Sequence, residues 1–250
     1  MNKYYIVSIT LMTSSLFCVS HSVQADPSSL GLGINVSDSP YKGYGTTYDP
    51  LPHIDYDNGN FFIDDTSLGA YVYNSHNQEL SIGLSYLADE FNPKDSDNRQ
   101  LKQLNKRHST LVAQLLYSLT TPIGVWSASL SGDVLNESNS ILVDTNYMFP
   151  IFYNKFTFVQ TIGINWADGN HNNYYFGVSH RESARSGLRY HHAKSSFTPY
   201  ISMTASYAIT SHANSFIGFR IDQLTGDVKK SPMVANSTVP NVYAGINYQF

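Results

Sequence analysis

Several segments of the chain alternate between apolar and polar residues, with the two-residue period of a β-strand that has one apolar face. The alternation is clearest at the C-terminus, where positions 242, 244, 246, 248 and 250 are apolar or aromatic. It recurs at 80–86, 126–134 and 200–207, where the polar partners are mostly Ser and Thr. Small neutral polar residues suit a confined, wet lumen, whereas a solvated sheet face usually carries charges. The apolar faces are therefore predicted to lie against lipid.

Twelve segments are candidate strands. They are residues 28–36, 51–58, 60–73, 79–88, 109–119, 124–134, 140–149, 156–166, 173–179, 197–208, 215–223 and 241–250. A membrane-spanning strand needs roughly 10 residues, so twelve strands use about half of the chain, sixteen leave too little for loops and eight leave too much. The predicted fold class is all-β, a transmembrane antiparallel β-barrel of about 12 strands, with 10 strands as the alternative.

The connections between these segments do not alternate cleanly between short and long. Short ones are expected at 74–78, 120–124, 149–155 and 209–214, and long ones at 38–50, 89–107, 180–196 and 224–240. Bacterial barrels place short turns in the periplasm and long loops outside. Counting back from a periplasmic C-terminus, segment 173–179 fits better as the end of a long strand or as loop structure. One of the first three segments is also open to reassignment.

The N-terminus resembles an export signal. Lys3 precedes an apolar stretch over residues 4–19, and Val23 and Ala25 are short residues at the two positions that a signal peptidase recognises. We predict a cleaved signal peptide at 1–25 and a barrel domain at 26–250. The single cysteine, Cys18, leaves with the signal, so the exported chain depends on its hydrogen-bonded ladder and its core and not on disulfides.

The composition agrees with a barrel and excludes one class of partner. Charged residues make up 14% of the chain, against about 25% in a typical soluble domain. The 250 residues include 19 Tyr and 13 Phe, which favour strands. The chain carries 15 basic and 19 acidic residues, and this net negative charge lacks the basic footprint that nucleic acid requires. No nucleic-acid partner is expected.

No catalytic, metal or cofactor motif stands out. The histidines at 171, 180, 191 and 192 have nonspecific spacing, with no HExxH pattern. Two Ser–His pairs, at 108–109 and 179–180, are adjacent in sequence, so on a strand their side chains point to opposite faces. The acidic pairs at 64–65 and 89–90 lack the spacing of a calcium loop and are expected to solvate strand ends. We therefore expect no enzyme activity, no cofactor and no metal.

A helix-like spacing occurs at 99–107, where Leu101 and Leu104 lie three residues apart among Lys102, Lys106 and Arg107. A short helix or turn within a loop accounts for this pattern. The functional alternative is a basic contact with lipid phosphate.

The most distinctive stretch runs from residue 172 to residue 188. It resembles the YYxGVSxxESxxSGL signature of the MipA/OmpV family of outer-membrane proteins, in particular its YiaT-type members. The matching positions are Tyr174, Tyr175, Gly177, Ser179, Glu182, Ser183, Ser186 and Gly187. Segments 39–44, 104–110 and 227–234 resemble other family motifs, so the resemblance extends from Leu30 to Phe250. A structural loop with an ion-pair network of Arg181, Glu182 and Arg185 at the barrel rim is favoured over a partner-binding epitope.

The resemblance implies a location and a role. It implies a barrel in the lipid of a Gram-negative outer membrane, with Ile246, Tyr248 and Phe250 as the signal read by the barrel assembly machinery. It also implies a scaffold that links a murein hydrolase, a membrane-bound lytic transglycosylase, to a bifunctional murein synthase in peptidoglycan synthesis and remodelling. A small-solute channel and a surface adhesin remain the alternatives.

Overall fold

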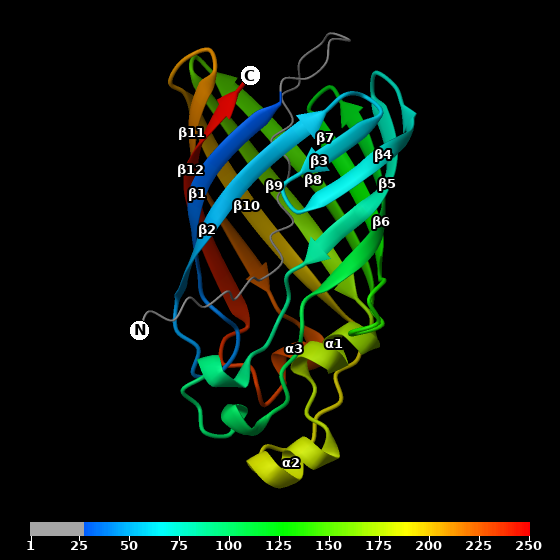
Figure 1. The fold of residues 1–250 in the computed structure, drawn as a ribbon, viewed down its shortest axis with the longest axis vertical. Coiled ribbons are helices and arrows are strands. Elements are labelled where there is room, and N and C mark those ends of the chain that lie inside the picture. The colour runs from blue at the N-terminus through cyan, green and yellow to red at the C-terminus, as the bar shows by residue number, and fades with distance from the viewer. Residues whose placement is uncertain (1–27) are drawn as a thin grey trace.

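Twelve antiparallel strands close into a barrel in the computed structural model, which describes residues 28–250 (Figure 1). Each strand pairs with its neighbours in sequence, and β1 pairs with β12 to close the ring. The strands are β1 (Ser29–Ser37), β2 (Thr47–Asp57), β3 (Phe61–Asp64), β4 (Ser67–Asn74), β5 (Gln78–Leu87), β6 (Thr110–Thr121), β7 (Gly124–Asp133), β8 (Ile141–Tyr153), β9 (Phe156–Ala167), β10 (Ser196–Ala208), β11 (Ala213–Gln223) and β12 (Thr238–Gln249). The predicted barrel class and strand number are confirmed. The predicted signal peptide, with Cys18, lies outside the described residues.

The two faces of the wall divide as the alternation predicts. Leu84 and Ile246 point outward with 41% and 56% of their surface exposed, as expected for side chains that contact lipid. The inward positions of β7 include Ser127, Ser129 and Ser131, all of them buried. Between residues 28 and 250, no helix is long and apolar enough to cross a membrane.

Two strand predictions were wrong in detail. The segment 60–73 is split into β3 and β4 by a tight turn at Asp65, which has a positive φ of 47°. The segment 173–179 is not a strand, because it covers the end of helix α1 (Gly169–Phe176) and the residues that lead into helix α2 (His180–Ser186). One predicted strand is lost and one is gained, so the total of twelve is unchanged. In addition, β2 begins at Thr47 and not at residue 51.

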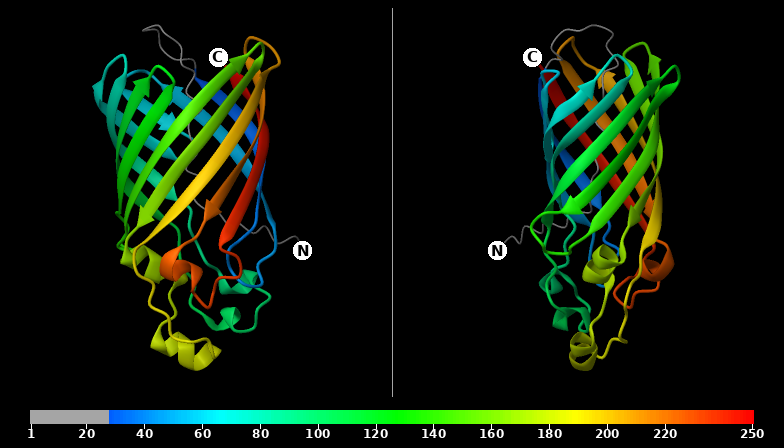
Figure 2. Two further views of the ribbon diagram at one scale, coloured as in Figure 1. Left: turned by 180° about the vertical axis from the view of Figure 1, so that it is seen from behind. Right: turned by 90° about the vertical axis from the view of Figure 1, so that its right-hand side faces the viewer.

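The two ends of the barrel differ in the length of their connections. One end carries turns of two to four residues together with the start of β1 and the end of β12. The other end carries loops that contain α1, α2, α3 (Gly226–Lys229) and the 3₁₀ helices η1 (Pro93–Asp95) and η2 (Leu101–Gln103) (Figure 2). By the rule for bacterial barrels, the short turns face the periplasm and the long loops face outward.

The wall has a lateral gap beside β2. Only residues 55–57 of β2 pair with β3, so residues 47–54 have a strand partner on the β1 side alone (Figure 1). At the inner end of the gap, the Ile54 carbonyl accepts the Asp65 N–H at 2.8 Å. At its outer end, the Tyr44 hydroxyl donates to the Asn92 carbonyl at 2.6 Å, joining the loop before β2 to the segment after β5. These contacts define the lateral gap in the outer half of the wall.

Two prolines protect the free edge of the lateral gap. The N–H and carbonyl of Ile54 point away from β1, toward the gap. In an antiparallel strand, the N–H and carbonyl groups of every second residue point to the same side. Pro50 and Pro52 share this direction, and proline has no N–H to donate. The edge therefore offers few donors to another strand, which is how natural barrels and sheets avoid unwanted pairing.

Candidate functional site in the loop plug

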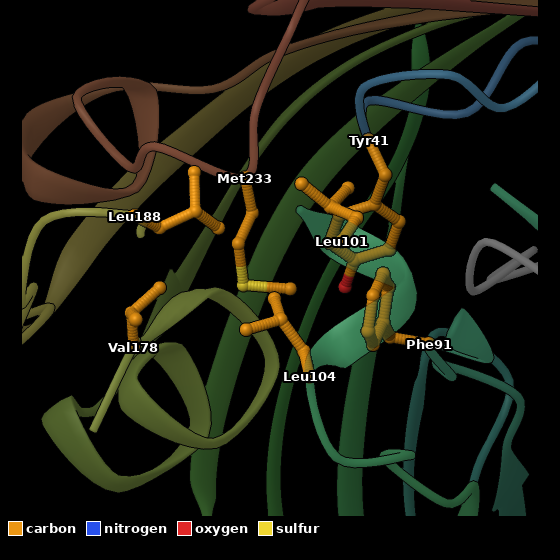
Figure 3. Packing of buried hydrophobic residues seen from close by; sticks show 7 residues of the cluster. All are labelled: Tyr41, Phe91, Leu101, Leu104, Val178, Leu188 and Met233. Atoms are coloured by element: carbon orange, nitrogen blue, oxygen red, sulfur yellow. The ribbon is translucent and has the colours of Figure 1, made fainter. Parts of the chain in front are cut away.

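The long loops fold into one unit at the outer mouth of the barrel, here called the loop plug and made of residues 38–46, 88–109, 168–195 and 224–237. Its apolar core draws one to three residues from each of these segments (Figure 3). The core residues are Tyr41, Phe91, Leu101, Leu104, Val178, Leu188 and Met233, each no more than 7% exposed. Burial of this apolar surface holds together segments that are far apart in sequence.

A buried ion pair lies at the centre of the loop plug. Arg107 Nη2 is 2.8 Å from Glu182 Oε1, and both side chains are less than 10% exposed. Arg107 also donates from Nε to the Tyr174 carbonyl at 2.6 Å and from Nη1 to the Asn105 carbonyl at 2.8 Å. The guanidinium is thus surrounded by acceptors. It does not face lipid phosphate, so that alternative is wrong for Arg107, whereas Lys102 and Lys106 are exposed.

Glu182 is held as a carboxylate by several donors. Its Oε1 accepts the Asn105 N–H at 2.9 Å, and its Oε2 accepts both the N–H and the hydroxyl of Ser179, at 3.0 and 2.8 Å. Burial raises the pKa of Glu182, but the hydrogen bonds from the Asn105 and Ser179 backbones and from Arg107 outweigh it and lower the pKa to about 2. The predicted rim network is therefore centred on Arg107 instead of Arg181, with Arg185 at 3.9 Å from Glu182.

Three further signature residues stabilise α2. Ser179 is its N-cap and forms a reciprocal capping box with Glu182. Ser183 donates its hydroxyl to the Leu188 carbonyl, and Ser186 donates to the Glu182 carbonyl, both at 2.6 Å. This Ser-x-x-Glu pattern and the N-cap Asp168 before α1 are helix-start signals. They were the evidence in the sequence against a strand at 173–179.

The remaining signature residues join α1 to the barrel rim. The buried Tyr175 donates its hydroxyl to the His108 carbonyl at 2.8 Å, and Tyr174 accepts the His108 N–H at 3.0 Å. Gly177 is also buried, and a Cβ there would lie 2.2 Å from the Asn173 carbonyl oxygen. The side chains of the signature thus make contacts within the loop plug, which fits a structural loop better than an exposed epitope.

Gly187 provides a direct test of this interpretation. It ends α2 with a left-handed φ of 72°, and a Cβ there would meet nothing closer than 3.5 Å. We expect Gly187→Ala to destabilise α2 by about 1–2 kcal/mol through backbone strain alone. The change is measured as a loss of amide-exchange protection in α2. Gly169→Ala is the matched control, because Gly169 begins α1 without a positive φ and has equal space. Equal effects of the two changes would contradict the assignment.

The histidines and acidic pairs occupy separate environments. His180 stacks on Tyr190, and His191 Nε2 lies 2.9 Å from the Asp227 carbonyl. In the described part of the chain, no group of three or more His, Cys, Asp or Glu side chains is placed to hold a metal ion. Asp65 lies 2.8 Å from His53, and Asp89 lies 3.4 Å from His171. One acid of each pair therefore contacts a histidine, which the prediction of strand-end solvation missed.

The three residues of the expected assembly signal lie on the outer face of β12 or directly after it. Ile246 and Tyr248 point outward, and the Tyr248 ring contacts the Phe250 ring edge-on at 5.2 Å. Phe250 is 66% exposed, and its N–H donates to the Ser28 carbonyl at 2.9 Å. The signal residues therefore form an exposed apolar strip at the seam between β12 and β1.

The comparisons with known proteins agree with this geometry. The family described as MltA-interacting protein MipA matches residues 30–250. The MltA-interacting protein of Escherichia coli (strain K12) is 34% identical over 250 residues, which cover 100% of both chains. The putative outer membrane protein YiaT of the same strain is 31% identical over 92% of this chain and 93% of that protein. Outer membrane protein OmpV of Vibrio cholerae is 25% identical over 84% and 81%. The chain is therefore an outer-membrane β-barrel that belongs to the MipA family.

Proposed function

We propose that this barrel is a non-enzymatic scaffold that holds a membrane-bound lytic transglycosylase, and with it a bifunctional murein synthase, for peptidoglycan synthesis and remodelling. The observation that carries the proposal is the relative named MltA-interacting protein, which is 34% identical over the whole length of both chains. A non-enzymatic role is supported by relatives that are named as interacting or outer membrane proteins.

The loop plug supports a scaffold over an open channel. Its apolar core and the Arg107–Glu182 pair lie at the outer mouth, where a solute channel needs an open path. A second apolar layer, formed by inward residues at the outer ends of four strands, lies below it. The members of this layer are Leu87, Val112, Leu142 and Ala167.

The partner enzymes work on peptidoglycan, so the docking surface of a scaffold belongs to the periplasmic end. The barrel offers five short turns there, at residues 58–60, 75–77, 122–123, 154–155 and 209–212. Aromatic residues surround them, among them Tyr153 and Phe156 on the β8–β9 hairpin. We propose that these turns and the neighbouring wall make the contact.

An affinity purification with turn replacements tests the scaffold. The tagged full chain is recovered from cross-linked, detergent-solubilised envelopes, and its partners are identified by mass spectrometry. We expect to recover a lytic transglycosylase with the tagged chain. It should no longer be recovered when the periplasmic turns are replaced. It should still be recovered when residues 134–137, in the outer loop between β7 and β8, are replaced. Recovery of assembly factors and abundant porins alone would contradict the scaffold.

The alternatives make different predictions in the same system. A small-solute channel predicts stepwise conductance in planar bilayers, and a surface adhesin predicts that deletion of residues 180–196 abolishes attachment.

We also propose that residues 1–25 are a cleaved signal peptide and that Ile246, Tyr248 and Phe250 are recognised by the barrel assembly machinery. The exposed apolar side chains of these three residues, on the outer face of β12 or directly after it, support the second of these proposals.

A further inference from the structure

Most of the basic residues of the chain gather on the loop plug. The chain has 15 Lys and Arg residues, and one of them, Lys3, precedes the described part. Of the other 14, twelve lie in the four segments of the loop plug, one is Lys155 in a periplasmic turn and one is Arg220 on β11. The same four segments contain eight acidic residues, so the loop plug is positive although the whole chain has a net charge of -4. The outward end of the barrel therefore attracts anions.

Six of these cations form one exposed surface, here called the basic face, on the η2 segment, on α2 and directly after α2. They are Arg99, Lys102, Lys106, Arg181, Arg185 and Arg189. Two contacts of Arg185 join the two parts, because its Nε donates to the Gln103 carbonyl and its Nη2 donates to Asn105 Oδ1 at 2.5 Å. Arg189 extends the basic face toward α3 by donating to the Lys230 carbonyl at 2.6 Å. Packing of the loops thus brings these cations together from separate parts of the sequence.

Acidic side chains do little to neutralise the basic face. Residues 98–109 contain no Asp or Glu, and residues 179–190 contain only Glu182. That carboxylate is buried and already paired with Arg107 at 2.8 Å, so Arg185, at 3.9 Å, is its second and more distant cation. None of the ion pairs between residues 28 and 250 involves the other five cations. Their charges are therefore available to a ligand.

A stacked pair of rings lies among the cations. The His180 and Tyr190 rings are parallel within 5°, their centres are 4.0 Å apart, and both side chains are exposed. Arg181 directly follows His180, and Arg189 directly precedes Tyr190. The electron-rich face of an aromatic ring attracts polarised C–H groups, such as those of a sugar ring. The fork of an arginine side chain matches the oxygens of a phosphate group. Rings and arginines together suit a phosphorylated sugar better than a bare anion.

The position of the basic face indicates where such a ligand lies. Figure 1 and Figure 2 both show α2 as the part of the loop plug farthest from the strands. Because the long loops face outward, α2 extends past the lipid boundary into the layer above it. In a Gram-negative outer membrane, this layer consists of the sugars of lipopolysaccharide, which carry phosphate groups. The phosphorylated sugars of this glycolipid are therefore the anions that the basic face meets first.

We propose that the basic face binds the phosphorylated core sugars of lipopolysaccharide in the outer leaflet around the barrel. Its arginines and lysines hold the phosphate groups, and the His180–Tyr190 pair packs against a sugar ring. This assigns the lipid-phosphate contact considered for residues 99–107 to Lys102 and Lys106, while Arg107 stays in the buried pair. The interaction is independent of the scaffold role, whose docking surface lies at the opposite end of the barrel.

Titration calorimetry on the full chain in phosphatidylcholine nanodiscs tests the ligand class with three soluble probes. They are the phosphorylated core oligosaccharide released from lipopolysaccharide by deacylation, the same oligosaccharide after dephosphorylation, and inorganic pyrophosphate. We expect the phosphorylated oligosaccharide to bind at least about 10-fold more tightly than either other probe, because it alone offers both phosphate and sugar. Equal binding of the dephosphorylated oligosaccharide, equal binding of pyrophosphate, or no binding of any probe would overturn the proposal. This series uses the unaltered protein and does not depend on the folding of any variant.

A matched pair of double variants tests the position of the site. Lys102→Gln with Arg181→Gln removes two exposed cations of the basic face and is expected to weaken binding of the phosphorylated oligosaccharide by about 10-fold. Lys94→Gln with Lys194→Gln removes the same charge from exposed positions elsewhere on the loop plug. We expect this control to weaken binding by less than about 3-fold at 150 mM salt, where charges more than about 8 Å apart are largely screened. Equal weakening by the two double variants would overturn the assignment to the basic face.

Discussion

Arg107→Met is expected to unfold the loop plug while the barrel stays intact. The change leaves the Glu182 carboxylate buried without its cation and removes the donors to the Tyr174 and Asn105 carbonyls. Breaking a buried ion pair by removing one partner costs about 3–5 kcal/mol. We therefore expect amide-exchange protection in α1 and α2 to fall by about two to four orders of magnitude. Proteolytic cleavage within residues 168–195 should accelerate by a similar factor.

The control for this change is Arg181→Met. Arg181 lies one residue before Glu182, is exposed and forms no ion pair within residues 28–250. Its replacement is expected to change the free energy of opening of α1 and α2, measured by amide exchange, by less than about 0.5 kcal/mol. If both variants lose protection equally, the buried pair is not what holds the loop plug.

The same pair gives the loop plug a defined pH dependence. The pKa of Glu182 is lowered to about 2 in the folded plug, from an ordinary value of 4.5. A lowered pKa contributes stability that is fully present above the unfolded value and is lost as the pH falls through the folded value. Protection of α2 is therefore expected to be constant above about pH 5 and to decline toward pH 2. In Glu182→Gln this decline should be absent, as followed by amide exchange.

Leu84→Arg is expected to lower the free energy of unfolding of the whole barrel by about 2–4 kcal/mol, the cost of an arginine that faces lipid near the bilayer midplane. Leu84 points outward from β5, between Leu68 on β4 and Ala113 on β6. Reversible denaturant titration in liposomes measures the change. A similar, depth-dependent cost is expected for Ile246→Arg, which lies nearer the periplasmic end of β12.

The neighbouring lumen position supplies the control. Ser85 follows Leu84, faces inward and accepts a hydrogen bond from the Ser67 hydroxyl at 2.8 Å. Ser85→Arg places the charge in a polar lumen and is expected to cost much less than Leu84→Arg. Asn247→Arg is the corresponding control for Ile246. Equal costs on the two faces would contradict the orientation of the wall.

The sequence predicted the barrel wall because the two-residue period is a local property. The side chains of a strand alternate between its two faces whatever the rest of the fold does, so Leu84, Ser85, Ile246 and Asn247 could be assigned to lipid or lumen directly. The strand number followed from length, since a membrane fixes the length of each strand. The family also followed from the sequence, because the signature residues occur in a fixed order.

The loops were less predictable, because their structure depends on contacts between distant segments. A short run such as 173–179 is rich in aromatic residues, which favour strands. The caps at Asp168 and Ser179 and the packing of Tyr175 nevertheless make its surroundings helical. The hairpin turn at Asp65 similarly depends on its contacts with β2, through His53 and Ile54.

The sequence by itself thus determined the class of fold, the lipid and lumen faces and the family. Only the tertiary structure decided the partners of the charged groups. Arg107 and Glu182 are 75 residues apart, and nothing local to either one indicates the other. The lateral gap and the basic face are likewise set by where β3 and β4 end and by how the loops pack over the mouth, because a missing strand pair or a shared surface exists only between segments that folding has brought together.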